Sequence, residues 1–398
     1  MSRQADPDVG SPSLLIRFWR SPGVRWCVFL FLGLRLGLAG FALVARATHS
    51  GPFIPDPVLR PYAGVESSTD PLLEPWQRWD TLYYQALAER GYSAFESSSF
   101  APPIYPMLMR WVGLVVGGNT LLGGIIVSNL AYLAALIYLF RLTRMEANDR
   151  QARYATLYMA IFPTAFFFLA AYTESLFLLT VVAAFYHARR KEWLLAGVWA
   201  SLAPLIRVQG PVVAPALAYE AARTWREVGM PRVRAVLGVM IAGIGAAAYP
   251  AYAWIALGEP PAQLMATHTR RFRGRFAIPG IAVFVALSLL LRGKFVQGDY
   301  LDLAATLLFF GLTVLVFRWL PSVYGVYNLL MLALVLSKVS DFGALVSMSR
   351  YVLAIFPGFM VLGRLGSSRP WLHRLIFYPS IAGLMYFTGQ FVIWGWAA

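Results

Sequence analysis

Residues 121–141 read LLGGIIVSNLAYLAALIYLFR, an apolar run that ends at an arginine. A helix needs about 20 apolar residues to cross the ~30 Å hydrocarbon layer of a bilayer. Apolar stretches that could do the same recur at 24–45, 153–168, 174–188, 193–207, 209–222, 235–257, 302–318, 321–337, 351–363 and 372–392. The sequence therefore predicts an all-α polytopic membrane protein with about eleven transmembrane helices.

The composition supports the same class. Of the 398 residues, 59% are hydrophobic and 13% are charged, whereas a soluble domain carries about 25% charged residues. The net charge of +15 comes mostly from arginines in short breaks between apolar runs, which is how membrane proteins fix their orientation. We therefore expect no nucleic-acid partner. Cys27 is the sole cysteine, so an intrachain disulfide is excluded.

The positions of the basic breaks orient the chain. With the N-terminus cytoplasmic, the positive-inside rule is satisfied by breaks at 141–153, 189–191, 223–234 and 364–374. The run 24–45 exceeds the roughly 7–15 apolar residues of a signal peptide, so we interpret it as a retained anchor. The stretch 278–291 is interpreted as a re-entrant or interfacial helix, because a crossing there would move the later basic breaks outside.

This orientation defines the expected domain organisation. We expect a single transmembrane domain over residues 1–398, without a separate soluble domain. The two largest outer loops cover residues 47–120 and 258–301, and they hold most of the polar, non-repetitive sequence. Any chemistry is therefore expected on the outer face.

The first outer loop contains the most informative segment, Trp76 to Tyr92. Four apolar side chains recur at helical spacing and predict an amphipathic helix at the membrane interface: Trp76, Trp79, Tyr83 and Leu87. Asp80 lies near the helix start and Gly91 is a plausible stop. On these grounds alone, Asp80 is either a capping residue or a catalytic carboxylate.

The same segment resembles the phosphatidylinositol-glycan class V (PIG-V) mannosyltransferases and their bacterial relatives. The resemblance rests first on Arg78-Trp79-Asp80, the pair Tyr83-Tyr84, Ala88 and Gly91-Tyr92. Four later segments follow in the family's order, namely Phe100–Pro106 (which departs at Ala101 and Pro103), Tyr172–Ser175, Arg207–Tyr219, and Ser347–Tyr351 with Phe356-Pro357. The matches run in the family's order from about residue 70 to residue 360, and this order makes the resemblance specific.

The resemblance implies a GT-C glycosyltransferase fold with a catalytic carboxylate in the first large outer loop, here Asp80. It also implies a polyprenyl-phosphate sugar donor and an inverting transfer of a hexose, with mannose as the first choice. The acceptor stays open between a glycolipid, a wall polymer and a protein. Compact loops and the lack of an ER-retrieval ending favour a bacterial plasma membrane, with the site facing outward.

Such a transfer needs a base for the acceptor hydroxyl and cations for the departing phosphate. The predicted phosphate ligands are Arg207, Arg270, Arg271, Arg273, Arg350 and His268. The predicted sugar, acceptor and lipid contacts are Trp76, Trp79, Tyr83, Tyr84, Tyr105 and Glu174. Glu174 could instead pair with an arginine, share the role of Asp80, or be a carboxylate at a helix start. We predict no cofactor, while a divalent metal stays open, although no tight Asp-x-Asp pair accompanies Asp80.

The alternative function is a transporter or flippase of a lipid-linked sugar. It would also need arginines and a lipid groove, but it would not need Asp80 as a base. Transporters often show internal repeats and charges near the membrane midplane. Apart from Arg35, interpreted as a structural partner for a carboxylate, the ionisable residues gather at the outer edge. This arrangement favours the enzyme.

Overall fold

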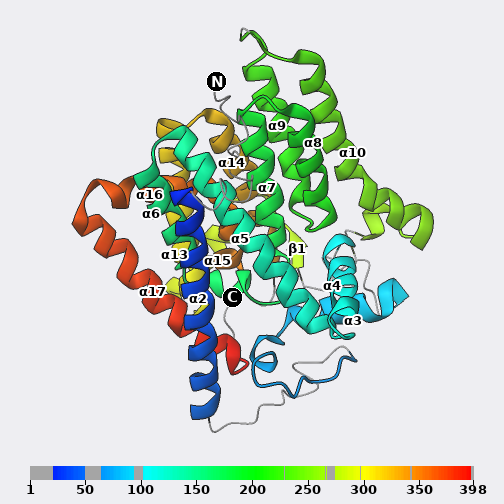
Figure 1. Ribbon diagram of the computed structural model, residues 1–398, viewed down its shortest axis with the longest axis vertical. Coiled ribbons are helices and arrows are strands. Elements are labelled where there is room, and N and C mark those ends of the chain that lie inside the picture. The colour runs from blue at the N-terminus through cyan, green and yellow to red at the C-terminus, as the bar shows by residue number, and fades with distance from the viewer. Residues whose placement is uncertain are drawn as a thin grey trace, which may run out of the picture.

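The computed structural model describes residues 21–49, 64–93, 102–227, 229–264, 266, 274–295, 297–340 and 343–395. These residues form one bundle of helices, with α3 and α4 at its lower end and α15 near its centre (Figure 1). The α-helices are α2 (Pro22–Thr48), α3 (Asp80–Arg90), α4 (Ile104–Val115), α5 (Thr120–Glu146), α6 (Asp149–Ala160), α7 (Glu174–Arg189), α8 (Trp193–Leu202), α9 (Val213–Arg223), α10 (Arg232–Leu257), α12 (Ile281–Leu291), α13 (Gln297–Trp319), α14 (Ser322–Leu336), α15 (Met348–Tyr351), α16 (Phe356–Ser368) and α17 (Pro370–Val392).

Short 3-10 helices connect several of these elements, and one small sheet joins two others. The 3-10 helices are η1 (Glu74–Trp76), η2 (Gly91–Ser93), η4 (Ala165–Phe168), η5 (Ala203–Leu205), η6 (Gly210–Val212) and η7 (Val352–Ala354). Strands β1 (Gly274–Phe276) and β2 (Lys338–Ser340) pair antiparallel, with Gly274 opposite Ser340. Nothing in the sequence pattern predicted this sheet. It ties residues 274–276 to the segment that leads into α15.

Within the described residues, α2, α5, α10, α13 and α17 are each long and apolar enough to cross a membrane. A sixth candidate is the pair 348–354 and 356–368, which is bent by 83°. The other predicted spans coincide with shorter helices or with pairs of them. The prediction of a helical multi-pass membrane protein is confirmed, whereas the number of about eleven spans stays a prediction.

Helix α12 covers only 11 residues, a rise of about 16 Å and roughly half of the hydrocarbon layer. That length agrees with the interpretation as a re-entrant or interfacial helix, which stays a prediction.

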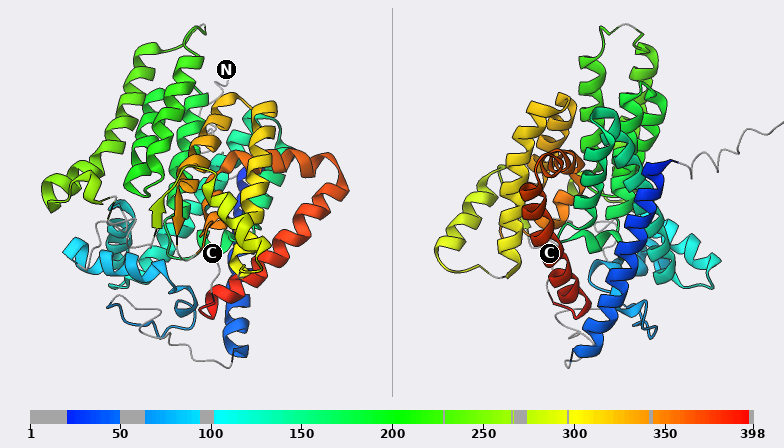
Figure 2. Two further views of the ribbon diagram at one scale, coloured as in Figure 1. Left: turned by 180° about the vertical axis from the view of Figure 1, so that it is seen from behind. Right: turned by 60° about the vertical axis from the view of Figure 1, so that its left-hand side comes forward.

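Small residues let the helices approach closely. A methyl group added to Gly197 in α8 would collide with the backbone of Gly238 in α10, and one added to Gly245 would collide with Ser201. Lipid supplies no hydrophobic driving force between helices, so the close van der Waals packing that glycine permits holds them together. At another edge of the bundle, α17 lies beside α2 (Figure 2).

The segment before Asp80 is anchored by a buried arginine. Arg78 is 1% exposed, donates to the Val392 carbonyl at 2.9 and 2.8 Å, and pairs with Glu74 at 2.6 Å. Arg46 of α2 pairs with the same Glu74. Burying these charges is tolerable because each has a partner, and the contacts fasten this loop to α2 and α17.

The helix that follows corrects one expectation. Gly91 ends α3 as predicted, but the helix begins at Asp80, so Trp76 lies on η1 and the expected stripe is broken. Seven of its side chains are buried, namely Thr81, Leu82, Tyr84, Gln85, Ala86, Leu87 and Ala88. A helix that is buried on most sides packs within the protein, so α3 does not lie with one face in the membrane–water interface.

Candidate active site

Asp80 follows a strained peptide. Trp79, directly before it, has φ 50° and ψ −117°, a conformation that non-glycine residues rarely adopt and that often marks a functional site. The Asp80 N–H donates to the Tyr172 hydroxyl at 3.2 Å, and that hydroxyl donates to the Arg78 carbonyl at 3.1 Å. Tyr172 therefore holds the backbone on both sides of Trp79 and fixes the start of α3.

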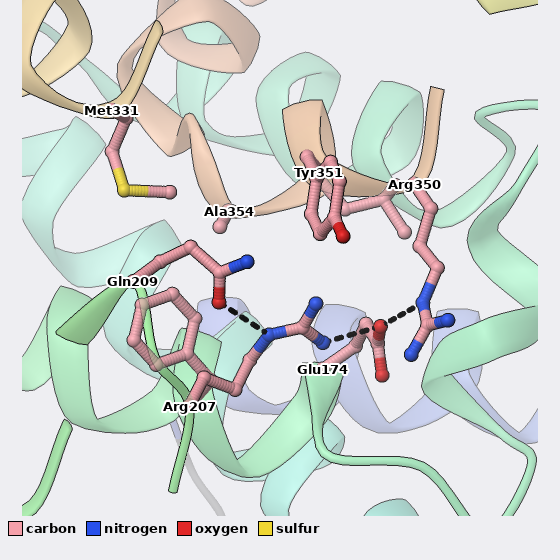
Figure 3. A pocket seen from close by; sticks show the side chains of 9 residues that line it. Glu174, Arg207, Gln209, Met331, Arg350, Tyr351 and Ala354 are labelled. Atoms are coloured by element: carbon pink, nitrogen blue, oxygen red, sulfur yellow. Dashed lines mark hydrogen bonds and ion pairs between the residues drawn. The ribbon is translucent and has the colours of Figure 1, made fainter. Parts of the chain in front are cut away.

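Two arginines and two carboxylates form a continuous chain at this point. Arg350 donates from Nη1 to Asp80 Oδ2 at 2.6 Å and from Nε to Glu174 Oε1. Arg207 pairs with the same Glu174 oxygen. Figure 3 shows Glu174 between the two guanidinium groups. These residues come from α3, α7, the loop after η5, and α15, and their formal charges cancel.

The two carboxylates, Asp80 and Glu174, differ in solvent exposure. The Glu174 side chain is 4% exposed and the Arg207 and Arg350 side chains are 10% exposed, whereas Asp80 is 25% exposed. A buried carboxylate is tolerated only with partners, and Glu174 has both arginines. Of the alternatives for Glu174, pairing with arginine is what the geometry shows, and its place as the first residue of α7 also suits the helix dipole. Asp80 is the carboxylate that a ligand can reach.

A small pocket, with room for about one water molecule, lies beside this chain of charges. Its polar lining includes Glu174, Arg207, Gln209 and Arg350, and its apolar wall is Phe177, Met331, Leu353 and Ala354, with Tyr351 alongside (Figure 3). Gln209 Oε1 accepts from Arg207 Nε at 3.3 Å. The pocket thus sets guanidinium groups opposite an apolar wall.

Aromatic and hydroxyl groups complete the surroundings. Arg350 stacks on Phe167 and Tyr172, with its guanidinium carbon 4.9 and 4.7 Å from the ring centroids. Thr173 accepts from Arg207 at 3.0 Å and lies 3.3 Å from the Tyr84 hydroxyl. Burial, together with the nearby charge of Asp80, holds the pKa of Tyr84 well above its ordinary value. The Tyr84 hydroxyl is therefore a neutral hydrogen-bonding group at physiological pH.

Several residues predicted to contact substrate are packed against other parts of the protein. Trp76 and Tyr105 are 1% and 0% exposed, so in this structure they present no surface to a ligand. Trp79 packs edge-on against Trp394, with ring centroids 5.7 Å apart, and Tyr83 is half-buried. The remaining predicted positions lie outside the described residues, namely His268, Arg270, Arg271, Arg273 and, from the family-like segment, Phe100 and Ala101.

Arg35 also differs from its expected role. Its guanidinium lies 5.0 Å from the centroid of the Trp76 ring, and no carboxylate of the described residues pairs with it. A cation over an indole face gains electrostatic stabilisation where no anion is present. The expectation of a carboxylate partner is therefore wrong for the described part of the chain.

Three contributors to the site were not predicted from the sequence. Tyr172 and Thr173 lie in the family-like segment Tyr172–Ser175, and Gln209 lies in Arg207–Tyr219, but only Glu174 and Arg207 were given roles there. In the parts of the chain that the structure describes, no cluster of three His, Cys, Asp or Glu side chains could hold a metal ion.

Comparison with known proteins places these features in a family. A family model described as Mannosyltransferase (PIG-V) matches residues 31–245, more than half of the chain. The match includes Asp80, Tyr172, Glu174 and Arg207, while Arg350 lies beyond it.

Curated relatives and solved structures give more distant matches. GPI mannosyltransferase 2 from Cryptococcus neoformans var. neoformans serotype D (strain JEC21 / ATCC MYA-565) is 30% identical over 146 residues, 34% of each chain. The protein of the same name from Chaetomium globosum is 30% identical over 174 residues, 39% of this chain and 36% of that one. The matches thus span about a third of these relatives. The archaeal oligosaccharyltransferase AglB from Archaeoglobus fulgidus, solved with an inhibitory peptide and a dolichol-phosphate, aligns over 95% of this chain and 56% of that one, with 12% identity and a TM-score of 0.43.

The family match agrees with the ordered segments found in the sequence and with the helical architecture. It confirms the predicted family, and the helices confirm the predicted all-α multi-pass membrane protein. On the strength of a match over more than half of its length, the chain belongs to the PIG-V mannosyltransferase family.

Proposed function

We propose that the protein is an inverting glycosyltransferase that moves a hexose, with mannose as the first candidate, from a polyprenyl-phosphate sugar to an acceptor hydroxyl on the extracytoplasmic face. The observation that carries this proposal is the ion-pair chain from Asp80 through Arg350 and Glu174 to Arg207. It sets a reachable carboxylate directly against the guanidinium group of Arg350, and Glu174 links that group to Arg207. A glycosyl transfer from a lipid phosphate needs both kinds of group in that proximity.

The reaction follows from these positions. The acceptor oxygen attacks the anomeric carbon while the bond from that carbon to the phosphate oxygen breaks, and the electron pair leaves with the phosphate. Asp80 takes the proton from the acceptor hydroxyl. Arg207 and Arg350 hold the phosphate, because guanidinium groups match phosphate oxygens in a fork geometry. A phosphate leaves as a stable anion, so the site needs no general acid.

Arg350 connects the two halves of this site. It lines the pocket and also bonds to Asp80, which is not part of the pocket lining. A donor phosphate in the pocket would offer Arg350 a new anionic partner, and Asp80 would then be free to receive a proton. The apolar wall of Phe177, Met331 and Leu353 is suited to the first units of the lipid chain.

The charge pattern supports a site on the outer face of the membrane. Asp80, Glu174, Arg207 and Arg350 all fall on the outer side when the positive-inside rule is applied, and the structure brings these four together. The β1–β2 pairing ends next to the segment that leads to Arg350. We therefore keep Arg270, Arg271, Arg273 and His268, which precede β1, as proposed phosphate contacts within a single transmembrane domain.

The acceptor is the least defined part of the proposal. The curated relatives are named GPI mannosyltransferases, which supports mannose as the sugar and makes a membrane glycolipid the first acceptor to test. A wall polymer or a protein would reach the same face. The proposed location is a bacterial plasma membrane.

A transfer assay tests the function. Purified protein is incubated with radiolabelled polyprenyl-phosphate mannose and a membrane lipid extract, and the products are separated by chromatography. We expect label in a new lipid product, and none when Asp80 is replaced by asparagine. Binding of the donor without any transfer to lipid, wall or protein acceptors would contradict the enzyme and favour a transporter of the lipid-linked sugar.

Tyr172→Phe is expected to slow transfer about 10-fold, because it removes the hydroxyl that bonds to Asp80 N–H and to the Arg78 carbonyl. Hydrogen bonds of this type contribute roughly 1 kcal/mol each. The ring remains to stack on Arg350, so donor affinity should hold. Tyr158→Phe is the matched control, since the Tyr158 hydroxyl bonds to His373 at 2.9 Å, away from the site. Equal rates for Tyr172→Phe and wild type would show that the strained peptide does not need this clamp.

A further inference from the structure

We propose that Asp302 is a positioning residue that fixes the phosphate-binding orientation of Arg350 by holding the backbone directly before it. The inference rests on the proposed function, because it assigns Arg350 to the donor phosphate. Asp302 lies in α13, far from Asp80 in the sequence.

The Asp302 carboxylate is fully committed to the start of α15. Oδ1 accepts from the Ser349 N–H at 2.7 Å and from the Ser349 hydroxyl at 2.6 Å, and Oδ2 accepts from the Ser347 N–H at 3.1 Å. Asp302 is 2% exposed and Ser349 is 0% exposed. Hydrogen bonds to a buried carboxylate are short and strong, so they define where Ser349 lies.

The segment that carries Arg350 depends on such support. Helix α15 has four residues, too few to be stable by itself, and the chain bends by 83° between Met348–Ala354 and α16. Ser347 has φ 64°, which is strained for a residue other than glycine. Thr164 donates to the Ser349 carbonyl at 2.6 Å from the opposite side. Ser349 is thus clamped between α13 and the segment before η4.

The clamp sets the direction of the neighbouring side chain. Arg350 follows Ser349 directly, and its Nε and Nη1 must reach Glu174 and Asp80 together. A small rotation of the Ser349 peptide would move the guanidinium off one of these partners. Groups that act at a site through another residue commonly tune it by this kind of support.

The test measures affinity for polyprenyl phosphate without sugar, by calorimetry on the detergent-purified full chain. We expect Asp302→Asn to weaken binding about 10- to 100-fold, as loss of hydrogen bonds to a charged group predicts. Ser349→Ala removes only the hydroxyl bond and is expected to weaken binding about 5-fold. Ser349→Ala replaces Asp302→Asn as the test variant if Asp302→Asn does not fold. Thr313→Val is the matched control, since Thr313 is buried in the same helix and bonds to Asn328 at 3.2 Å.

A double-variant cycle separates positioning from general stability. If Asp302 acts through Arg350, Asp302→Asn adds no further loss to Arg350→Ala, because effects that share one route are not additive. Additive losses, or equal losses in Thr313→Val, would overturn the role of Asp302. If Arg350→Ala binds the lipid phosphate as wild type does, the proposed phosphate site itself fails and this inference falls with it. A loss in Arg350→Ala with wild-type binding by both Asp302→Asn and Ser349→Ala would overturn Asp302 alone.

Discussion

Asp80→Asn is expected to lower the turnover of sugar transfer by about 10²- to 10⁴-fold, the contribution of a positioned general base. Asparagine keeps the size of the side chain and an oxygen for Arg350, but it cannot take the acceptor proton. Donor affinity should hold or rise, because Arg350 no longer has the Asp80 charge as a competing partner. The measurement is the initial rate with saturating labelled donor, alongside the dissociation constant of polyprenyl phosphate.

Glu89→Gln provides the matched control for this result. Glu89 lies on the same helix, is exposed, and accepts from Thr120 at 2.7 Å. Removing its charge should leave transfer within about 2-fold of wild type, as is usual for surface substitutions. Wild-type turnover by Asp80→Asn would remove Asp80 from the role of base and leave the ion-pair chain without a catalytic carboxylate.

Arg350→Ala should produce the largest combined effect on binding and stability. It removes a phosphate ligand and leaves the buried Glu174 with Arg207 alone. Breaking a buried ion pair in this way costs ~3–5 kcal/mol in the free energy of unfolding. We expect a lower melting temperature and a loss of polyprenyl phosphate affinity of at least about 100-fold, measured by thermal unfolding and calorimetry.

Two further variants test whether the loss of affinity comes from the guanidinium group of Arg350. Arg350→Lys keeps the charge but not the planar fork, so its donor affinity should fall between wild type and Arg350→Ala. Arg364→Ala removes an exposed arginine that stacks on Trp319 at 4.6 Å, and its donor affinity should not change. If Arg350→Ala retains wild-type affinity, Arg350 serves only to neutralise the two carboxylates.

The helices were predictable because their cause is local. Each apolar run is long enough to be seen without knowing its neighbours, and Asn119, whose side chain accepts from the Leu122 N–H at 2.9 Å, marks a helix start in the usual way. The start of α3 was not predictable from periodicity. The strained Trp79 and the anchor of Arg78 to Val392 interrupt the pattern, and both depend on tertiary contacts.

The sequence predicted which residues form the site better than it predicted how they are arranged. Asp80, Glu174, Arg207 and Arg350 were each singled out by motif and by expected depth, but 270 residues separate Arg350 from Asp80 and 176 separate it from Glu174. Spacing along the sequence gives no means of pairing such groups. Asp302 and the β1–β2 sheet were missed for the same reason, since their partners lie in distant segments.

The balanced charge of the four-residue chain has a consequence for product release. Two carboxylates and two guanidiniums sum to zero, so in the proposed reaction a phosphodiester donor would bring the occupied site to one negative charge. Transfer moves a proton onto Asp80 and leaves a phosphate monoester, which carries about −1.5 to −2 charges at pH 7. When Asp80 then gives its proton to water, the site holds about one more negative charge than it did with the donor. In the proposed reaction that excess would repel the spent lipid, so deprotonation of Asp80 would be coupled to release of the lipid phosphate.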